Sequence, residues 1–264
     1  FFLLNTEFMN VKAKKYLGQH FLTDENNAKN IVDALSFDHY QKILEVGPGM
    51  GVLTKYLLDK ESEIFVAEID HESVEYLQKH YAKLDNQHII GDFLKLNIAE
   101  TFESQVAIIG NFPYNISSQI LFKIIDYYDY IPEMVGMFQK EVAERTAAVP
   151  RTKAYGILSV LVQALYDVDY LFTVHENVFN PPPKVKSGVI KLTRNPKEGL
   201  VGNEILFKKI VKAGFGQRRK KLSNSLKVLE IPEALQSHLF MDKRAEELTI
   251  QDFISFTQEW KNAL

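Results

Sequence analysis

The stretch ILEVGPGMGVLT, residues 43–54, decides the fold of this chain. A short apolar run leads into three glycines, and an amphipathic run leaves them. Gly47, Gly49 and Gly51 allow the backbone to turn tightly and to come close to a ligand. A glycine-rich turn between a strand and a helix is typical of the carboxyl edge of an open α/β sheet, where such folds bind ligands. A plain tight turn is the alternative.

Apolar and amphipathic runs alternate on both sides of this stretch, between about residues 22 and 140. This alternation predicts an α/β fold with a mostly parallel sheet that is covered on both faces. Later runs continue the pattern. Strands are expected at residues 42–46, 63–69, 88–90, 106–110, 134–139, 167–174 and 187–193, and helices at 52–59, 72–84, 117–128, 140–148 and 156–166.

The pattern changes after Pro196, where only helical spacing is found. Helices are expected at residues 203–215, 218–229, 231–239 and 249–262. We therefore predict a small helical domain at residues 200–264 behind a main domain at residues 12–199. Residues 1–11 are expected to be a disordered tail or an addition to the native chain.

The bulk composition is that of a soluble globular protein, with 46% hydrophobic and 25% charged residues. The sequence contains no cysteine, which excludes disulfides and cysteine-ligated zinc and is compatible with a reducing cytoplasm. No apolar run reaches the roughly 18–20 residues that span a bilayer. We expect a cytoplasmic, monomeric protein without a metal or a membrane partner.

The charge is unevenly distributed along the chain. Residues 184–228 hold thirteen Lys or Arg and two acidic residues, whereas the whole chain has a net charge of −3. A solvated helical face is one explanation. So lopsided a block in an otherwise acidic chain favours a polyanionic partner.

Two acidic residues follow predicted strands next to the glycine turn. Glu68 lies 19 residues beyond Gly49, where a carboxylate can accept hydrogen bonds from both hydroxyls of a ribose. An acidic residue near the start of a helix is the alternative. Asp92 could accept a hydrogen bond from an adenine amine, while Phe93 covers the ring.

The nucleotide-like ligand is not a dinucleotide or a nucleoside triphosphate. The glycine spacing is not G-x-G-x-x-G, and no Lys-Ser or Lys-Thr pair follows it as in a P-loop. A ligand with ribose, adenine and a small zwitterionic end fits better. We therefore expect S-adenosylmethionine.

The run Asn111-Phe112-Pro113-Tyr114 follows the expected strand at residues 106–110. It resembles the Asn-x-Pro-Tyr motif of amino-methyltransferases. The side-chain carbonyl of Asn111 and the backbone carbonyl of Phe112 would accept the two hydrogens of adenine N6. Pro113 restrains Phe112 to an extended conformation, and Tyr114 would stack on an extruded base. A capped turn with a buried tyrosine is the alternative.

Further motifs resemble those of one family from about residue 12 to the C-terminus. They are KKYLGQHFLTD, EVGPGMG, GNFPYNISSQILF, FQKEVAERTAA, KAYGILSVLVQ, VFNPPPKVKSGVI and RRKKLSNSL. Together they resemble the KsgA family, the ribosomal RNA small-subunit dimethyladenosine transferases. The resemblance implies a Rossmann-like class I S-adenosylmethionine-dependent methyltransferase domain with a small all-helical C-terminal domain.

The resemblance also implies a reaction. Two adjacent adenosines near the 3′ end of 16S rRNA, in the immature 30S subunit, become N6,N6-dimethyladenosines. His20 and Leu22 would line the cofactor site together with Gly47, Glu68, Asp92 and Asn111. Many relatives have Asn in place of His20. Phe179, ahead of a proline run, would offer a second aromatic surface to the base, with a core phenylalanine as the alternative.

Basic residues would hold the RNA through its phosphates, which position a substrate without reading its sequence. The predicted contacts are Lys12, Lys14, Lys15, Lys184, Lys186, Arg218, Arg219, Lys220 and Lys221.

Two alternative functions share these motifs. A 23S rRNA adenine methyltransferase of the macrolide-resistance type has the same glycine turn and Asn-x-Pro-Tyr run, but PPPKVKSGVIKL and RRKKLSNSL favour the small-subunit enzyme. A non-catalytic assembly or transcription factor on the same fold is the other alternative, and the intact set of site residues argues against it.

Overall fold

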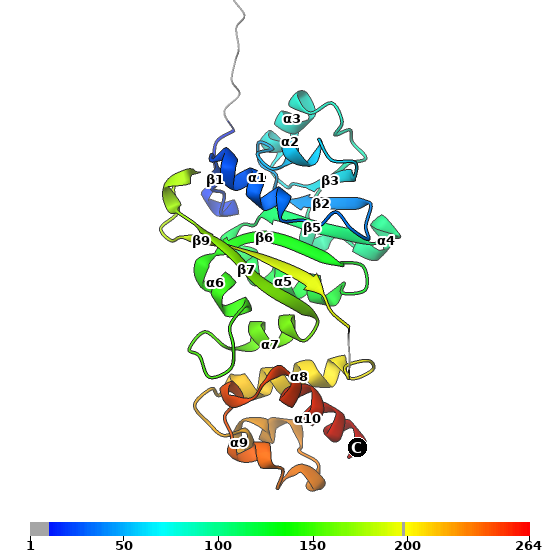
Figure 1. Ribbon diagram of the computed structural model, residues 1–264, viewed down its shortest axis with the longest axis vertical. Helices are drawn as coiled ribbons and strands as arrows, with labels where there is room; N and C mark the ends of the chain where they lie inside the picture. The colour runs from blue at the N-terminus through cyan, green and yellow to red at the C-terminus, as the bar shows by residue number, and fades with distance from the viewer. Residues whose placement is uncertain (1–10, 197–198) are drawn as a thin grey trace, which may run out of the picture.

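The computed structural model describes residues 11–196 and 199–264 (Figure 1). The first ten residues, which include most of the expected tail, lie outside this description. Within the described residues the main feature is a seven-stranded sheet. Its strands, in spatial order, are β4 (Ile89–Ile90), β3 (Glu63–Ala67), β2 (Lys42–Val46), β5 (Val106–Asn111), β6 (Glu133–Gln139), β9 (Ser187–Arg194) and β7 (Tyr166–Val174).

The sheet is mostly parallel, as the sequence predicted. Strands β2 to β6 pair in parallel, and β9 is inserted antiparallel between β6 and β7. Successive strands run outward from β2 on one side and from β5 on the other. The order therefore reverses between β2 and β5, and open α/β sheets bind ligands beside the carboxyl ends of the strands at such a point.

Helices cover both faces of the sheet (Figure 1). Residues that alternate along a strand point to opposite faces, so Leu44 and Ile43 on β2 belong to separate core clusters. On one face lie α1 (Glu25–Asp33), α2 (Thr54–Leu57) and α3 (His71–His80); on the other lie α4 (Ile98–Phe102), α5 (Ser117–Asp126), α6 (Lys140–Thr146) and α7 (Ile157–Gln163).

All elements after β9 are helical. They are α8 (Glu204–Gly216), α9 (Leu222–Ser225) and α10 (Ile250–Asn262), with short 3-10 turns between them. Phe207 and Ile210 on α8 are buried in the same cluster as Val160 and Leu161 on α7. The helical part therefore shares a continuous core with one face of the sheet, and its separation as a domain at residue 200 stays a prediction.

A second, two-stranded sheet joins distant parts of the chain. Strand β1 (Phe21–Leu22) pairs antiparallel with β8 (Phe179–Asn180). The pairing places the segment before β1 next to the prolines that follow β8. This small sheet could not be predicted from a periodic sequence pattern, because each of its strands has only two residues.

Short 3-10 helices connect several elements and turn the chain where a longer helix would not fit. They are η1 (Lys15–Leu17), η2 (Phe93–Lys95), η3 (Tyr114–Ile116), η4 (Glu176–Val178), η5 (Leu226–Leu229), η6 (Glu233–Leu235), η7 (Leu239–Asp242) and η8 (Ala245–Glu247).

Several predicted helices were wrong in extent. The helix expected at 231–239 is replaced by a 3-10 turn between Glu230, which has a left-handed φ of 52°, and His238, which caps the next turn. The helix expected at 218–229 begins only at Leu222, because Lys221 is extended and bridges to Arg244.

The sequence analysis also missed two helices. Asp24 caps the start of helix α1, because its carboxylate accepts a hydrogen bond from the backbone N–H of Asn27. Asn97 caps α4 in the same way, with its side-chain oxygen accepting from the N–H of Glu100. Acidic and amide side chains at these positions are ordinary helix starts. They could have revealed both helices.

Candidate active site

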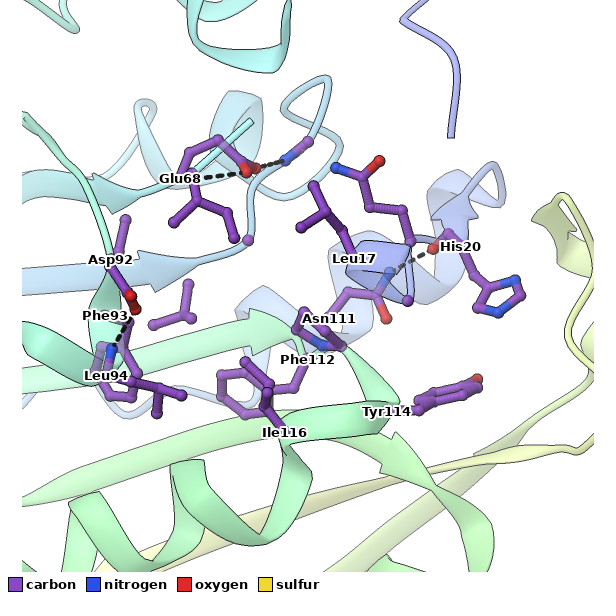
Figure 2. A pocket seen from close by; sticks show the side chains of 18 of the residues that line it. Leu17, His20, Glu68, Asp92, Phe93, Leu94, Asn111, Phe112, Tyr114 and Ile116 are labelled. Carbon is purple, nitrogen blue, oxygen red and sulfur yellow. Dashed lines mark hydrogen bonds between the residues drawn. The ribbon is translucent and has the colours of Figure 1, made fainter. Parts of the chain in front are cut away.

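A pocket opens at the carboxyl ends of the strands where the strand order reverses (Figure 2). We call it the sheet-edge pocket. Its walls come from the loops after β2, β3, β4 and β5 and from the segment before β1. It brings together most of the predicted site residues, namely His20, Gly47, Gly49, Glu68, Asp92, Phe93, Asn111, Phe112, Pro113 and Tyr114.

The glycine loop after β2 forms one wall because its backbone is left-handed. Gly47 and Gly49 have φ values of 71° and 55°. A Cβ added at Gly49 would lie 2.8 Å from the ring of Phe21. A side chain at Gly49 would therefore clash with the segment that closes the pocket, and only glycine satisfies both conditions.

Glu68 begins the loop after β3 and is almost fully buried, with 7% of its surface exposed. One carboxylate oxygen accepts from the N–H of Gly49 at 3.2 Å, and the other accepts from the N–H groups of Ile69 and Asp70 at 2.9 Å each. Burial raises the pKa of Glu68, and these backbone hydrogen bonds oppose the rise. The carboxylate is thus fixed in place and can accept further hydrogen bonds.

Asp92 and Phe93 form the far end of the pocket. An oxygen of Asp92 accepts from the N–H of Leu94 at 2.9 Å, which fixes the carboxylate at the start of η2. Phe93 is 4% exposed and lines the pocket with its remaining surface. Figure 2 shows both residues beside Leu94, well separated from His20 and Tyr114.

Asn111, the last residue of β5, has an orientation that its hydrogen bond determines. Its side-chain Nδ2 donates to the backbone carbonyl of His20 at 2.9 Å. A carbonyl only accepts, so the amide nitrogen must face His20 and Oδ1 must face away from it. Among the described residues Oδ1 has no hydrogen-bond partner, and Figure 2 shows it on the side of Tyr114.

Phe112 presents its backbone rather than its side chain. Its ring is 1% exposed and packs against Phe138 at 4.8 Å between centroids. Its N–H donates to the carbonyl of Met137, and within the described chain no group donates to its own carbonyl. Two acceptors, Asn111 Oδ1 and the Phe112 carbonyl, are therefore adjacent and available.

Tyr114 is held at both its ring and its hydroxyl. The hydroxyl is 2.6 Å from the hydroxyl of Ser187, and the ring stacks on His20 with centroids 5.5 Å apart at 29°. Burial raises the pKa of Tyr114. His20 Nδ1 is 2.7 Å from the carbonyl of Pro181 and must carry the proton, since the carbonyl only accepts.

A second pocket, the outer pocket, lies on the other side of His20 and Tyr114. Gly18, Gln19, His20 and Tyr114 line both pockets and form their common wall. The outer pocket adds apolar, amide and basic groups from distant segments. These are Ala13, Lys15, Gln139, Pro181, Pro182, Pro183, Lys184 and Val185.

A fixed buried carboxylate beside a glycine loop fits a ribose-bearing ligand, and the available acceptors at Asn111 and Phe112 fit an amine. Comparison with known proteins decides the family. The chain matches the ribosomal RNA adenine dimethylase family over residues 10–262. The chain belongs to that family.

Relatives and solved structures of the dimethylase family agree with this assignment. The chain is 59% identical to the ribosomal RNA small subunit methyltransferase A of Flavobacterium johnsoniae, over 94% of this chain and 96% of that protein. It is 56% identical to the protein of the same name from Cytophaga hutchinsonii, over 94% and 96%. A crystal structure of a dimethyladenosine transferase from Plasmodium falciparum has a TM-score of 0.80 at 25% identity, covering 92% of this chain and 98% of that one.

The 23S rRNA methyltransferase ErmE shares the fold of this dimethylase-family chain. The TM-score is 0.63 at 24% identity, covering 89% of this chain and 98% of ErmE. Together with the match above, these structures confirm the predicted Rossmann-like α/β fold.

Two predicted site residues of the dimethylase lie outside the sheet-edge pocket. Leu22 and Phe179 pair in the two-stranded sheet, and each is only 4% exposed. Leu22 lines a neighbouring cavity under the glycine loop, which we call the loop cavity. Phe179 is packed in the core and lines neither the sheet-edge nor the outer pocket, because its strand pairing turns the ring inward. This structure therefore does not support its predicted role as a stacking surface.

The predicted RNA-contacting cations fall into two groups. Three are engaged in ion pairs: Lys14 with Asp70 and Glu72, Arg218 with Glu246, and Lys221 with Asp242. For the others the structure shows no ion pair within its described range, so their charges remain available to a polyanion. These are Lys12, Lys15, Lys184, Lys186, Arg219 and Lys220.

The contacts that hold the segment before β1 in place were not predicted from the sequence. We call Lys14–His20 the strap. Its Lys14 ammonium and the Gln19 amide both bond the carboxylate of Asp70, whose side chain is 1% exposed. Asp70 in turn donates its N–H to Glu68. Because these contacts join residues more than fifty positions apart, no local pattern could have revealed them.

Glu45 is a second group that sequence reasoning missed. It lies on β2, is 1% exposed and lines the loop cavity. The hydroxyl of Thr54 donates to it at 2.6 Å. Burial raises the pKa of Glu45 to about 8, with a smaller contribution from the charge of Glu68. A buried carboxyl with a raised pKa therefore lines the same cavity as Gly47 and Gly51 of the glycine loop.

The described residues contain neither a metal-binding cluster nor a membrane-spanning helix. No group of three or more His, Cys, Asp or Glu side chains is arranged to hold a metal ion. Nor does any helix have the length and apolar character needed to cross a membrane.

Proposed function

We propose that this chain transfers methyl groups from S-adenosylmethionine to N6 of two adjacent adenosines near the 3′ end of 16S rRNA, within the immature small ribosomal subunit. Membership of the ribosomal RNA adenine dimethylase family supports the base and the reaction. The relatives named ribosomal RNA small subunit methyltransferase A, at 59% and 56% identity, support the small subunit. The proposal places the chain in the cytoplasm, acting as a monomer.

The residues of the sheet-edge pocket fit the proposed donor. S-adenosylmethionine would supply an electrophilic methyl group on a sulfonium. Glu68, held by three backbone N–H groups, would accept both ribose hydroxyls, and Asp92 would accept from the adenine amine beside Phe93. The left-handed glycines leave the space that the ligand needs.

The orientation of Asn111 is the observation that carries the proposal. Its Nδ2 donates to the His20 carbonyl, so Oδ1 faces away from His20, within the sheet-edge pocket and on the side of Tyr114 (Figure 2). Oδ1 and the Phe112 carbonyl would accept the two hydrogens of N6. This contact favours the pyramidal nitrogen, whose lone pair is localised and can attack a methyl carbon. Positioning supplies much of the rate, and the proton of the methylated nitrogen passes to water.

The outer pocket fits the extruded base and its backbone. Tyr114 offers a ring for stacking, which is how enzymes hold a flipped base. Lys15 and Lys184 flank the pocket and would meet phosphates, which position the RNA without reading its sequence.

One experiment tests the proposal and separates it from its main rival. Small and large subunits from cells that lack the corresponding methylation are purified, and each is incubated with the chain and radiolabelled S-adenosylmethionine. We expect label in the small subunit alone, on two adjacent adenosines when the modified bases are mapped. Label in the large subunit would favour the 23S enzyme, and no label in either would favour a non-catalytic factor.

A further inference from the structure

Ser187 lies outside the predicted site, yet it contacts the residue expected to hold the base. It is the first residue of β9 and is fully buried. On one side it pairs with Gln139 of β6, and on the other with Val174 of β7. A hydroxyl in the middle of three paired strands has little freedom to move.

Tyr114 lies in a short turn rather than in the sheet, and its carbonyl accepts a hydrogen bond from the hydroxyl of Ser117 at 3.0 Å. Tyr114 begins η3, a single turn of three residues, and the residue before it makes no side-chain capping hydrogen bond. The ring of a tyrosine rotates readily about its last side-chain bond unless its surroundings hold it. Apart from the His20 ring on one face, the contact that orients the ring is the 2.6 Å hydrogen bond to Ser187.

We propose that Ser187 is a positioning residue for methyl transfer, which fixes the plane of the Tyr114 ring against which the target adenine stacks. The inference rests on the proposed function, because it assigns the base to Tyr114. His20 stacks on one face of the Tyr114 ring in this structure. The hydrogen bond to Ser187 therefore also keeps the Tyr114 ring stacked on His20. The Tyr114 ring is therefore already ordered before the base binds, so binding does not have to include the entropy cost of ordering it.

The test compares three variants: Ser187→Ala, Tyr114→Phe and the double variant. Each single change removes the same hydrogen bond and leaves the aromatic ring. A hydrogen bond of this kind contributes about 0.5–1.5 kcal/mol, so we expect kcat/KM for RNA to fall roughly two- to tenfold in each single variant. The double variant should be no worse than the poorer single variant, because the two changes act on one interaction.

A matched control is available next to this pair. The hydroxyl of Tyr170 lies 2.7 Å from that of Thr173, both on β7, and neither residue lines the sheet-edge or outer pocket. Tyr170→Phe removes a hydrogen bond of the same chemistry from the same sheet. We expect it to leave kcat/KM for RNA unchanged, and we expect all variants to bind S-adenosylmethionine as tightly as the unmodified chain.

The outcomes separate the two proposals. If the unmodified chain fails to methylate adenosine in any RNA, the proposed function is wrong. If it is active but Ser187→Ala has unchanged kcat/KM, or if the losses in the double variant multiply, the role of Ser187 is wrong. Weakened donor binding in Ser187→Ala, equal to the loss of kcat/KM, would also contradict it by showing general damage to the site. Partial rescue by Ser187→Cys, which keeps the size and a weak hydrogen-bonding group, would support it.

Discussion

The sheet-edge pocket and the outer pocket share a wall but differ in their charged side chains. Those of the sheet-edge pocket are hydrogen-bonded within the protein, whereas those of the outer pocket are exposed. In the sheet-edge pocket the carboxylates of Glu68 and Asp92 are fixed by backbone N–H groups. In the outer pocket Lys15 and Lys184 are exposed, and no ion pair to either is found within the described chain. A pocket for a small ligand can be completed by the protein itself, whereas a surface for RNA must leave its cations for the phosphates.

The largest effect is expected at Asn111, in the wall of the sheet-edge pocket. Asn111→Ala removes the acceptor presented to N6, and loss of one preorganised polar group in an active site costs about 100- to 1,000-fold in rate. We expect methyl transfer to fall at least to that extent, while binding to the small subunit stays largely intact. Filter binding and label incorporation measure the two quantities.

Asn97→Ala is the matched control for Asn111. Asn97 caps α4 at a distance from both pockets, so its loss should lower stability by about 1 kcal/mol without affecting transfer. Full activity in Asn111→Ala would remove the role assigned to that amide.

The next largest effect should be confined to the sheet-edge pocket. Glu68→Gln removes the negative charge that we propose accepts the ribose hydroxyls, and it turns an amide N–H₂ toward backbone N–H groups. Hydrogen bonds to charged groups contribute about 1.5–3 kcal/mol, so donor affinity should fall roughly 10- to 100-fold by calorimetry. Glu75→Gln, an exposed change on α3, should have no effect. Equal weakening of RNA binding by Glu68→Gln would show that donor binding and RNA binding are energetically coupled.

Donor binding should also depend on pH through the same residue. In the proposed complex the ionised form of Glu68 accepts the hydroxyls, and burial raises its pKa above the ordinary value. Donor affinity should therefore be constant well above this raised pKa and should decline as the pH falls through it. Titrations of donor affinity against pH measure this, and a curve that Glu68→Gln leaves unchanged would assign the dependence to another group.

Stability should depend on pH through Glu45. Its pKa is about 8 in the folded chain and near the model-peptide value of 4.5 when unfolded. Between these values the folded state binds more protons than the unfolded state, so this group stabilises less as the pH rises. Denaturation in urea should show the decline between about pH 5 and pH 8, on the order of a few kcal/mol in all. Glu45→Gln should flatten it, and an unchanged slope would contradict the assignment.

The smallest effects are expected in the outer pocket. Lys15→Ala and Lys184→Ala should each weaken RNA binding roughly two- to fivefold and leave donor affinity unchanged, because an exposed cation contributes little alone. Each lost phosphate contact should reduce the slope of log affinity against log salt by about 0.7–0.9. Lys29→Ala, exposed on α1, is the control. An unchanged slope in both variants would place the RNA elsewhere.

The residues that line the sheet-edge pocket could be predicted from the sequence better than the contacts that hold those residues in place. Glu68, Asp92 and Asn111 could be found because each lies at or within two residues of the end of a strand, and the carboxyl ends of parallel strands meet at one edge. The contacts that orient them could not. Ser187 and Tyr114 are 73 residues apart, and Lys14 and Asp70 are 56 apart. Such side-chain contacts produce no periodic pattern in the sequence. The strand pairing that buries Phe179 produces none either.

The strap has a consequence for successive turnovers. Gly18, Gln19 and His20 form part of both pockets, so one short segment touches both the donor site and the site expected for RNA. Spent donor that left past the strap would disturb the surface to which we expect the RNA to bind. We therefore expect the chain to release its RNA between consecutive transfers, so that singly modified adenosines accumulate early in a time course and are converted only after rebinding.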